Sequence, residues 1–146
     1  MYRSILIALD REDEAGCRLM ADRCRERFGG PLTAIHLAYV RTRLPRSYLQ
    51  QLPKHWEADD RADAQRWLRA LAEITGLSAS LAGVHSPSSP ASREVTALAA
   101  ALGVEAICVL AHRIDLGRAL LGTSTHAIVR DALCDVIVMR DWTNDG

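Results

Sequence analysis

Short runs of consecutive apolar residues alternate along this chain with longer segments whose apolar residues recur every three or four positions. The runs cover residues 5–9, 32–40, 77–84, 106–110 and 136–139. Runs of this length are typical of strands buried on both faces of a sheet. The periodic segments end near residues 28, 75, 102 and 131, and a glycine follows each of the first three. This spacing predicts four amphipathic helices.

The predicted elements alternate as β-α-β-α-β-α-β-α-β. Such alternation favours a doubly wound α/β fold, with a five-stranded parallel sheet flanked by helices. The second helix is predicted over residues 54–75 and the fourth over residues 116–131, and Leu102 is expected on the buried face of the third. With 146 residues, the chain is interpreted as one domain spanning residues 1–146.

Charge and composition narrow the possible functions. The chain carries 18 basic and 18 acidic residues, so its formal net charge is zero. A nucleic-acid partner is not expected, because phosphate binding needs a basic surplus. No apolar run approaches the roughly 20 residues of a membrane span, and the first residues lead directly into a strand without a signal peptide. The four cysteines form no Cys-x-x-Cys motif, which favours reduced thiols, a cytoplasmic location and no metal site.

A doubly wound sheet binds ligands beyond the carboxyl ends of its strands, where the strand order reverses. The residues expected there are Asp10, Val40, His112 and Arg113, which follow or end predicted strands. The segment Gly122-Thr123-Ser124 is expected near the start of the fourth helix, where free N–H groups attract anions. Each of these residues also has a structural interpretation, as a strand end, a solvated loop or a close helix contact.

Two segments carry a resemblance to a known family. Residues 2–10, YRSILIALD, resemble the first strand of the universal stress proteins. Residues 120–123, LLGT, followed by ALCDVIV at residues 132–138, are similar to that family's C-terminal part. The resemblance covers essentially the whole chain in element order. It implies a five-stranded parallel sheet, a dimer and, in one branch, ATP bound by a Gly-x-x-Gly-x9-Gly-Ser/Thr loop.

The ATP loop of that branch is altered in this chain. Ala111-His112-Arg113-Ile114 stands at the Gly-x-x-Gly positions, and the distance from Ile114 to Gly122 is two residues shorter than the pattern. Glycines let a backbone approach phosphate closely, and a β-branched isoleucine does not. Of the family's motif only Asp10, Gly122 and Thr123 carry over. The chain therefore resembles the branch that lacks the ATP-binding glycine loop.

The last predicted strand supplies a candidate dimer contact. Val136, Ile137, Val138 and Met139 form a short apolar strand near the chain end, where it is expected at a sheet edge. An exposed apolar edge strand promotes aggregation unless a partner strand covers it. We therefore expect a homodimer built through this strand.

The sequence carries none of the common catalytic motifs, including a nucleophile elbow, a Walker loop and His-Glu-x-x-His. The leading hypothesis is a dimeric, non-enzymatic regulatory protein that contacts protein partners of unknown identity and has no cofactor. The alternative is a nucleotide-binding stress-response switch with a modified phosphate loop. In that case ATP would contact Asp10, Val40, His112, Arg113, Gly122, Thr123 and Ser124.

Overall fold

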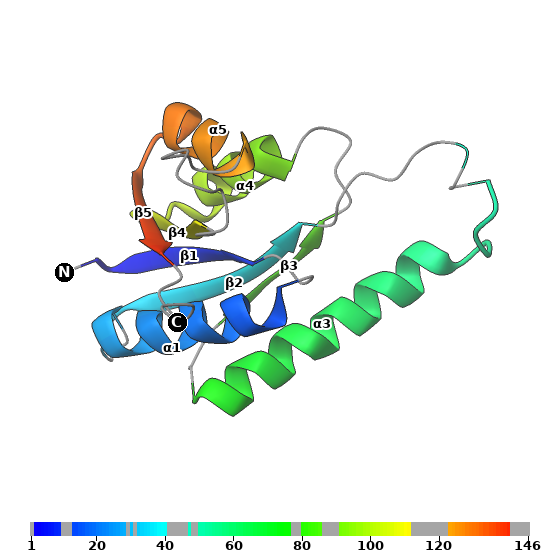
Figure 1. Ribbon diagram of the computed structural model, residues 1–146, viewed down its shortest axis with the longest axis horizontal. Helices are drawn as coiled ribbons and strands as arrows, with labels where there is room; N and C mark the ends of the chain where they lie inside the picture. The colour runs from blue at the N-terminus through cyan, green and yellow to red at the C-terminus, as the bar shows by residue number, and fades with distance from the viewer. Residues whose placement is uncertain are drawn as a thin grey trace, which may run out of the picture.

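The computed structural model of the protein describes residues 2–9, 13–28, 30, 32–40, 47, 50–76, 80–85, 91–111 and 123–140. These residues form an α/β fold in which a parallel sheet lies between two layers of helices (Figure 1). The strands are β1 (Ser4–Leu9), β2 (Ala34–Val40), β3 (Ser80–His85), β4 (Ala106–Ala111) and β5 (Asp135–Arg140). The helices are α1 (Glu14–Phe28), α3 (Trp56–Thr75), α4 (Ala91–Leu102) and α5 (Thr123–Asp131).

The described strands form one five-stranded sheet in the order β3-β2-β1-β4-β5, and every neighbouring pair is parallel. Helices α1 and α3 cover one face of the sheet, and α4 and α5 cover the other (Figure 1). The predicted doubly wound architecture is therefore confirmed, and β1 occupies the centre of the sheet with β5 at one edge.

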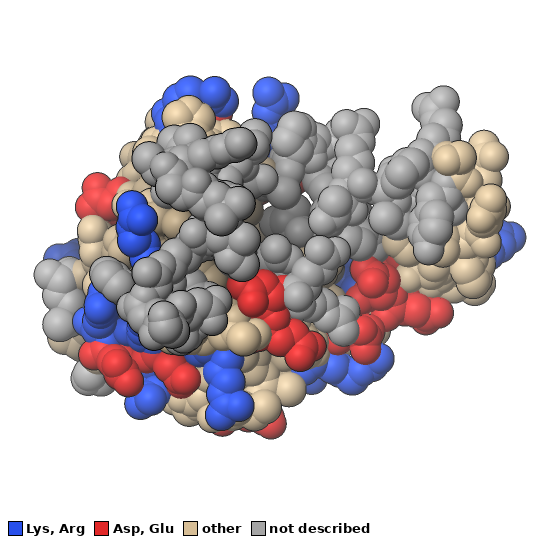
Figure 2. Space-filling model, viewed as in Figure 1, with Lys and Arg blue, Asp and Glu red and all other residues tan. Residues whose placement is uncertain are grey.

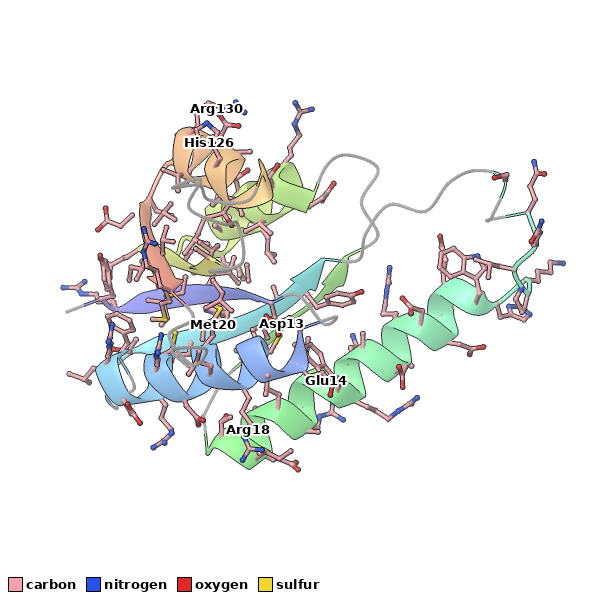
Figure 3. All side chains as sticks on the ribbon, viewed as in Figure 1. Asp13, Glu14, Arg18, Met20, His126 and Arg130 are labelled. Carbon is pink, nitrogen blue, oxygen red and sulfur yellow. The ribbon has the colours of Figure 1, made fainter. Side chains whose placement is uncertain are left out.

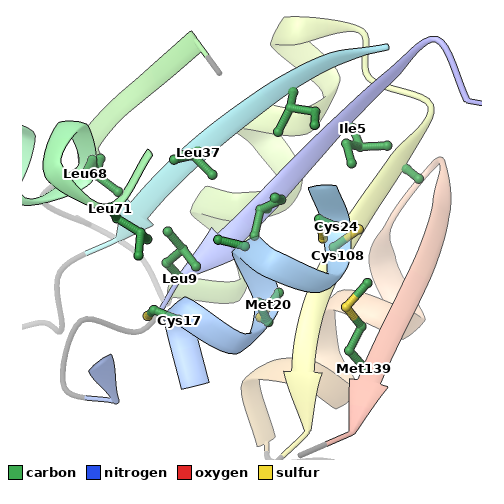
Figure 4. Close-up of a cluster of buried hydrophobic side chains, with 14 of the residues drawn as sticks. Ile5, Leu9, Cys17, Met20, Cys24, Leu37, Leu68, Leu71, Cys108 and Met139 are labelled. Carbon is green, nitrogen blue, oxygen red and sulfur yellow. The ribbon is translucent and has the colours of Figure 1, made fainter. Parts of the chain in front are cut away.

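The continuous apolar runs reflect burial on both faces. In β1, Ile5 and Ile7 pack toward α1 and α3, whereas Leu6 packs toward α4 and α5. All three side chains are fully buried. Because successive strand residues point to opposite faces, a strand covered on both sides needs apolar residues at consecutive positions. Figure 4 shows the first of the two cores, between the sheet and α1.

Helix α3 is the longest described helix, and one stripe of it holds it to the sheet. Its buried residues recur at helical spacing: Ala64, Leu68, Leu71 and Thr75. Gly76 ends the helix in a left-handed conformation with φ 69°, where glycine avoids the steric cost of a side chain. The N-terminal part of α3 extends beyond the ends of the strands (Figure 1).

Several predicted boundaries were wrong by a few residues. The strand predicted from residue 32 begins at Ala34, because Thr33 N–H donates to the Gly30 carbonyl, 3.1 Å away, and closes a turn. Leu102 is 37% exposed rather than buried. The chain leaves α4 at Gly103, which has φ 67°, and Val104 is buried instead. Helix α5 is described only from Thr123, so residues 116–122 of its predicted span lie outside the described residues.

Candidate functional site

The strand order reverses between β1 and β4, and the two strands separate at their carboxyl ends. Their pairing runs from Ile5 with Ala106 to Ile7 with Cys108. Strand β1 nevertheless continues to Leu9, and β4 continues to Ala111. From β1 the chain moves outward to β2 and β3, and it then crosses to β4 and β5 on the other side. This point is the place where doubly wound folds bind ligands.

The first turn of α1 lies directly against this point. Asp13 precedes the helix, and its Oδ1 accepts a hydrogen bond from the Gly16 N–H at 3.0 Å. This contact satisfies one of the free N–H groups at the helix start. A Cβ added to Gly16 would lie 2.1 Å from Asp13 Oδ2 and 2.7 Å from Leu110 Cδ2. Gly16 therefore allows the start of α1 to approach the end of β4 closely.

The predicted ligand residues are placed only in part. Asp10, His112, Arg113 and Gly122 lie outside the described residues. The backbone of Val40 is the last residue of β2, so it lies at the carboxyl edge of the sheet as expected. Thr123 and Ser124 form the start of α5. The assignment of these seven residues to a ligand site remains a prediction.

An aromatic pair at the same edge was not predicted as part of the site. Tyr39, near the end of β2, meets Trp67 of α3 edge to face, with ring centroids 6.2 Å apart. Tyr39 lies beside Leu9 in the strand register, so the pair adjoins the end of β1. The sequence shows each ring on its own element, but no local pattern indicates that the two rings meet. Trp67 therefore packs α3 against the end of β2.

Carboxylates are concentrated on the described surface at the N-terminal ends of α1 and α3. Figure 2 shows acidic side chains gathered over the N-terminal ends of α1 and α3. Glu14, Glu57, Asp59 and Asp63 are exposed there, and Asp63 pairs with Arg66 on α3 at 3.7 Å. Figure 3 shows Asp13 and Glu14 together at the N-terminal end of α1. Within the described residues, this surface repels rather than attracts a polyphosphate.

The described histidines and cysteines do not gather into a metal site. No group of three or more potential histidine, cysteine, aspartate or glutamate ligands occurs among the described residues. His36 is half-buried on β2, and His126 is exposed on α5. Figure 3 shows His126 near Arg130 on α5, and Arg130 donates two hydrogen bonds of 2.8 Å to Asp131. All four cysteines are free thiols.

The sequence profile of the universal stress protein family matches residues 1–140. The chain belongs to the universal stress protein family. This assignment agrees with the parallel five-stranded sheet and with the resemblance of residues 2–10, 120–123 and 132–138. No curated protein sequence gives a match to the chain.

Solved structures of universal stress proteins share this fold. One from Burkholderia pseudomallei superposes with a TM-score of 0.65 at 15% identity, over 94% of this chain and 96% of that one. One from Archaeoglobus fulgidus in complex with dAMP gives a TM-score of 0.60 at 15% identity, over 94% and 97%. One from Arabidopsis thaliana with AMP bound gives 0.61 at 11% identity, over 94% and 90%. At these identities the likeness establishes the fold alone.

No helix within the described ranges is long and apolar enough to cross a membrane.

Proposed function

We propose that this universal stress protein is a non-enzymatic regulatory protein of the cytoplasm, which acts as a homodimer through protein contacts and without ATP. The observation that carries the proposal is the surface around β5, at one edge of the sheet (Figure 1). At residues 111–114 the sequence departs from the glycine motif of the ATP-binding branch, which supports the absence of ATP. The acidic side chains beside the carboxyl edge support it as well, because they oppose the approach of a polyphosphate.

Among the described residues, β5 has no strand partner on its outer side, and exposed apolar side chains lie beside it. Val136, Ile137 and Val138 are each half-buried, so part of every side chain remains accessible at the edge. Leu133, in the turn before β5, is 96% exposed, and Val129 on α5 is 45% exposed. An apolar edge with exposed leucine and valine beside it favours a contact that removes this surface from water.

We favour a second copy of the chain as the partner at this surface. In a two-fold dimer the same residues face each other, so the two β5 strands would run antiparallel and pair their open backbone groups. The self-complementary contact would cover Leu133 and Val129 of both copies at once. It would leave the carboxyl edge of the sheet accessible to regulatory partners.

Replacing Leu133 with lysine tests the dimer. Burying a leucine contributes about 1.5–3 kcal/mol, and a two-fold dimer would bury Leu133 of both copies. We therefore expect Leu133→Lys to weaken dimerisation by at least about 100-fold. Because Leu133 is 96% exposed, the substitution should leave the circular dichroism spectrum unchanged. Sedimentation equilibrium across a concentration series measures the dissociation constant.

Leu32→Lys is the matched control for this experiment. Leu32 is 86% exposed, but it precedes β2, which is separated from β5 by β1 and β4. We expect the control to dimerise like the wild type. A monomeric wild-type chain at micromolar concentration would contradict the proposed dimer, and so would equal effects of the two substitutions.

The second candidate function is a nucleotide-binding switch. Similar folds have been solved with dAMP and with AMP. Such a ligand would be expected at the point where β1 and β4 separate. The first turn of α5 is expected at the same place. The backbone N–H groups at Thr123 and Ser124 suit a phosphate group, whereas the carboxylates at the N-terminal ends of α1 and α3 do not.

Titration calorimetry with ATP, ADP and cyclic AMP separates the two functions. The proposal predicts no binding heat for any of these nucleotides at concentrations up to about 1 mM, equivalent to a binding free energy weaker than about 4 kcal/mol. A saturable signal would instead support the switch. In that case Thr123→Pro, which is compatible with the first turn of a helix but removes one N–H donor, should weaken binding.

A further inference from the structure

Two thiols from different layers of the fold meet in the core between the sheet and α1. Cys24 on α1 and Cys108 on β4 both have 0% exposure and belong to the same cluster of buried side chains. Figure 4 shows their side chains facing each other. Neither side chain belongs to the candidate ligand site or to the β5 surface.

The other two cysteines are not placed to join this pair. Cys17 lies seven residues before Cys24 on the same helix, which separates them by about 10 Å along the axis. Figure 4 shows Cys17 away from Cys108. Cys134 packs with the cluster on the opposite face of the sheet. Cys24 and Cys108 are therefore the two cysteines that face each other in this core.

The environment keeps the Cys24 thiol protonated in the folded protein. The hydrogen bond with Cys108 and burial both raise the pKa of the Cys24 thiol above its ordinary value. Because the thiolate is the reactive form, exchange through the closed core is expected to be slow. Thiol–disulfide exchange becomes fast when the chain is unfolded. Refolding then determines which disulfide persists.

We propose that Cys24 and Cys108 form a reversible redox couple, which closes under oxidising conditions into a disulfide that joins α1 to β4. With glutathione disulfide as the oxidant, one protein thiolate attacks it, forms a mixed disulfide and releases one glutathione thiolate. The second protein thiolate then attacks the mixed disulfide at the protein sulfur and releases the second glutathione. Two protein thiols are oxidised to one disulfide, and one glutathione disulfide is reduced to two thiols.

A disulfide bond would bring the two sulfur atoms closer together than they are as thiols. The core around the pair can adjust to this change. Met20 and Met139 are buried in the same cluster and lie close to the pair in Figure 4. Methionine is unbranched and flexible, so it can follow a small displacement of its neighbours. The disulfide would hold the helix that begins at the candidate site against the central strands.

Refolding the full chain from urea in a glutathione redox buffer tests the proposal. After acid quenching and alkylation, we expect an intact mass with two modified cysteines instead of four, and a peptide map joining Cys24 to Cys108. The disulfide closes a long loop, so the oxidised protein should melt at least about 5 °C higher than the reduced protein. Dithiothreitol should reverse both changes.

Two variants make the outcome specific. The Cys17→Ala/Cys134→Ala protein should form the same disulfide and show the same rise in melting temperature. Cys24→Ala, with its fold checked by circular dichroism, should form no disulfide that includes Cys108. A disulfide that uses Cys17 or Cys134 would overturn the proposal. Glutathione adducts without an internal disulfide, or an oxidised form that melts no higher than the reduced form, would also overturn it.

Discussion

Gly16→Ala is expected to destabilise the protein by about 2–3 kcal/mol, although alanine is the better helix former. The added methyl group would lie 2.1 Å from Asp13 Oδ2 and 2.7 Å from Leu110 Cδ2. Either Asp13 moves and its 3.0 Å cap on the Gly16 N–H is lost, or α1 moves away from β4. Urea denaturation followed by circular dichroism measures the change in the free energy of unfolding.

A double-mutant cycle with Asp13→Ala identifies the cause of this effect. Asp13→Ala alone removes the cap and should cost about 1 kcal/mol. In the double variant the clash with the carboxylate is gone, and only the contact with Leu110 remains. The double variant should therefore be about 1 kcal/mol more stable than the sum of the single effects predicts. A Gly16→Ala protein as stable as the wild type would refute the close approach of α1 to β4.

Leu68→Ala is expected to destabilise the protein by about 3 kcal/mol, within a range of about 2–5 kcal/mol. Leu68 has no exposed surface and lies in the centre of the stripe that holds α3 to the sheet. Truncating it leaves a cavity between the helix and the sheet that its neighbours fill only in part. Trp67 is the neighbour of Leu68 on α3 and contacts Tyr39. The same change should therefore also alter the fluorescence of Trp67.

The same helix offers a matched control for this prediction. Ile74 is 62% exposed on α3, and Ile74→Ala removes as many carbon atoms as Leu68→Ala. We expect Ile74→Ala to change the free energy of unfolding by less than about 0.5 kcal/mol. Chemical denaturation of both variants gives the comparison. Equal losses of stability would contradict the assignment of Leu68, rather than Ile74, to the face that packs on the sheet.

The fold was predictable because its signals are local. A strand covered on both faces requires consecutive apolar residues, and Ile5 to Ile7 supply them within a few positions. Helix α3 follows from the spacing of Ala64, Leu68 and Leu71, and its end follows from Gly76. The boundary errors arise where a hydrogen-bonded turn, such as that at Thr33, replaces a strand that the apolar pattern would have continued.

The candidate site was predictable only in outline. The site lies where the strand order of the sheet reverses. The alternation of strands and helices along the chain allows only a few such strand orders. The contact of Tyr39 with Trp67 joins residues of two separate elements. In the sequence, Gly16 is an ordinary glycine inside a predicted helix. It is needed because the helix lies close to Leu110, which is 94 positions away. No periodicity within one element encodes such a contact.

The β5 surface illustrates how the two levels combine. The run from Val136 to Met139 is apolar in the sequence, which determined that it is a strand with buried surface. The sheet order agrees with the expected edge position of this strand, and only the tertiary structure decided that Leu133 and Val129 are exposed beside it. The pairing of Cys24 with Cys108 was likewise decided by packing. Local periodicity determines which faces are apolar, whereas the packing of the layers determines which of those faces meet.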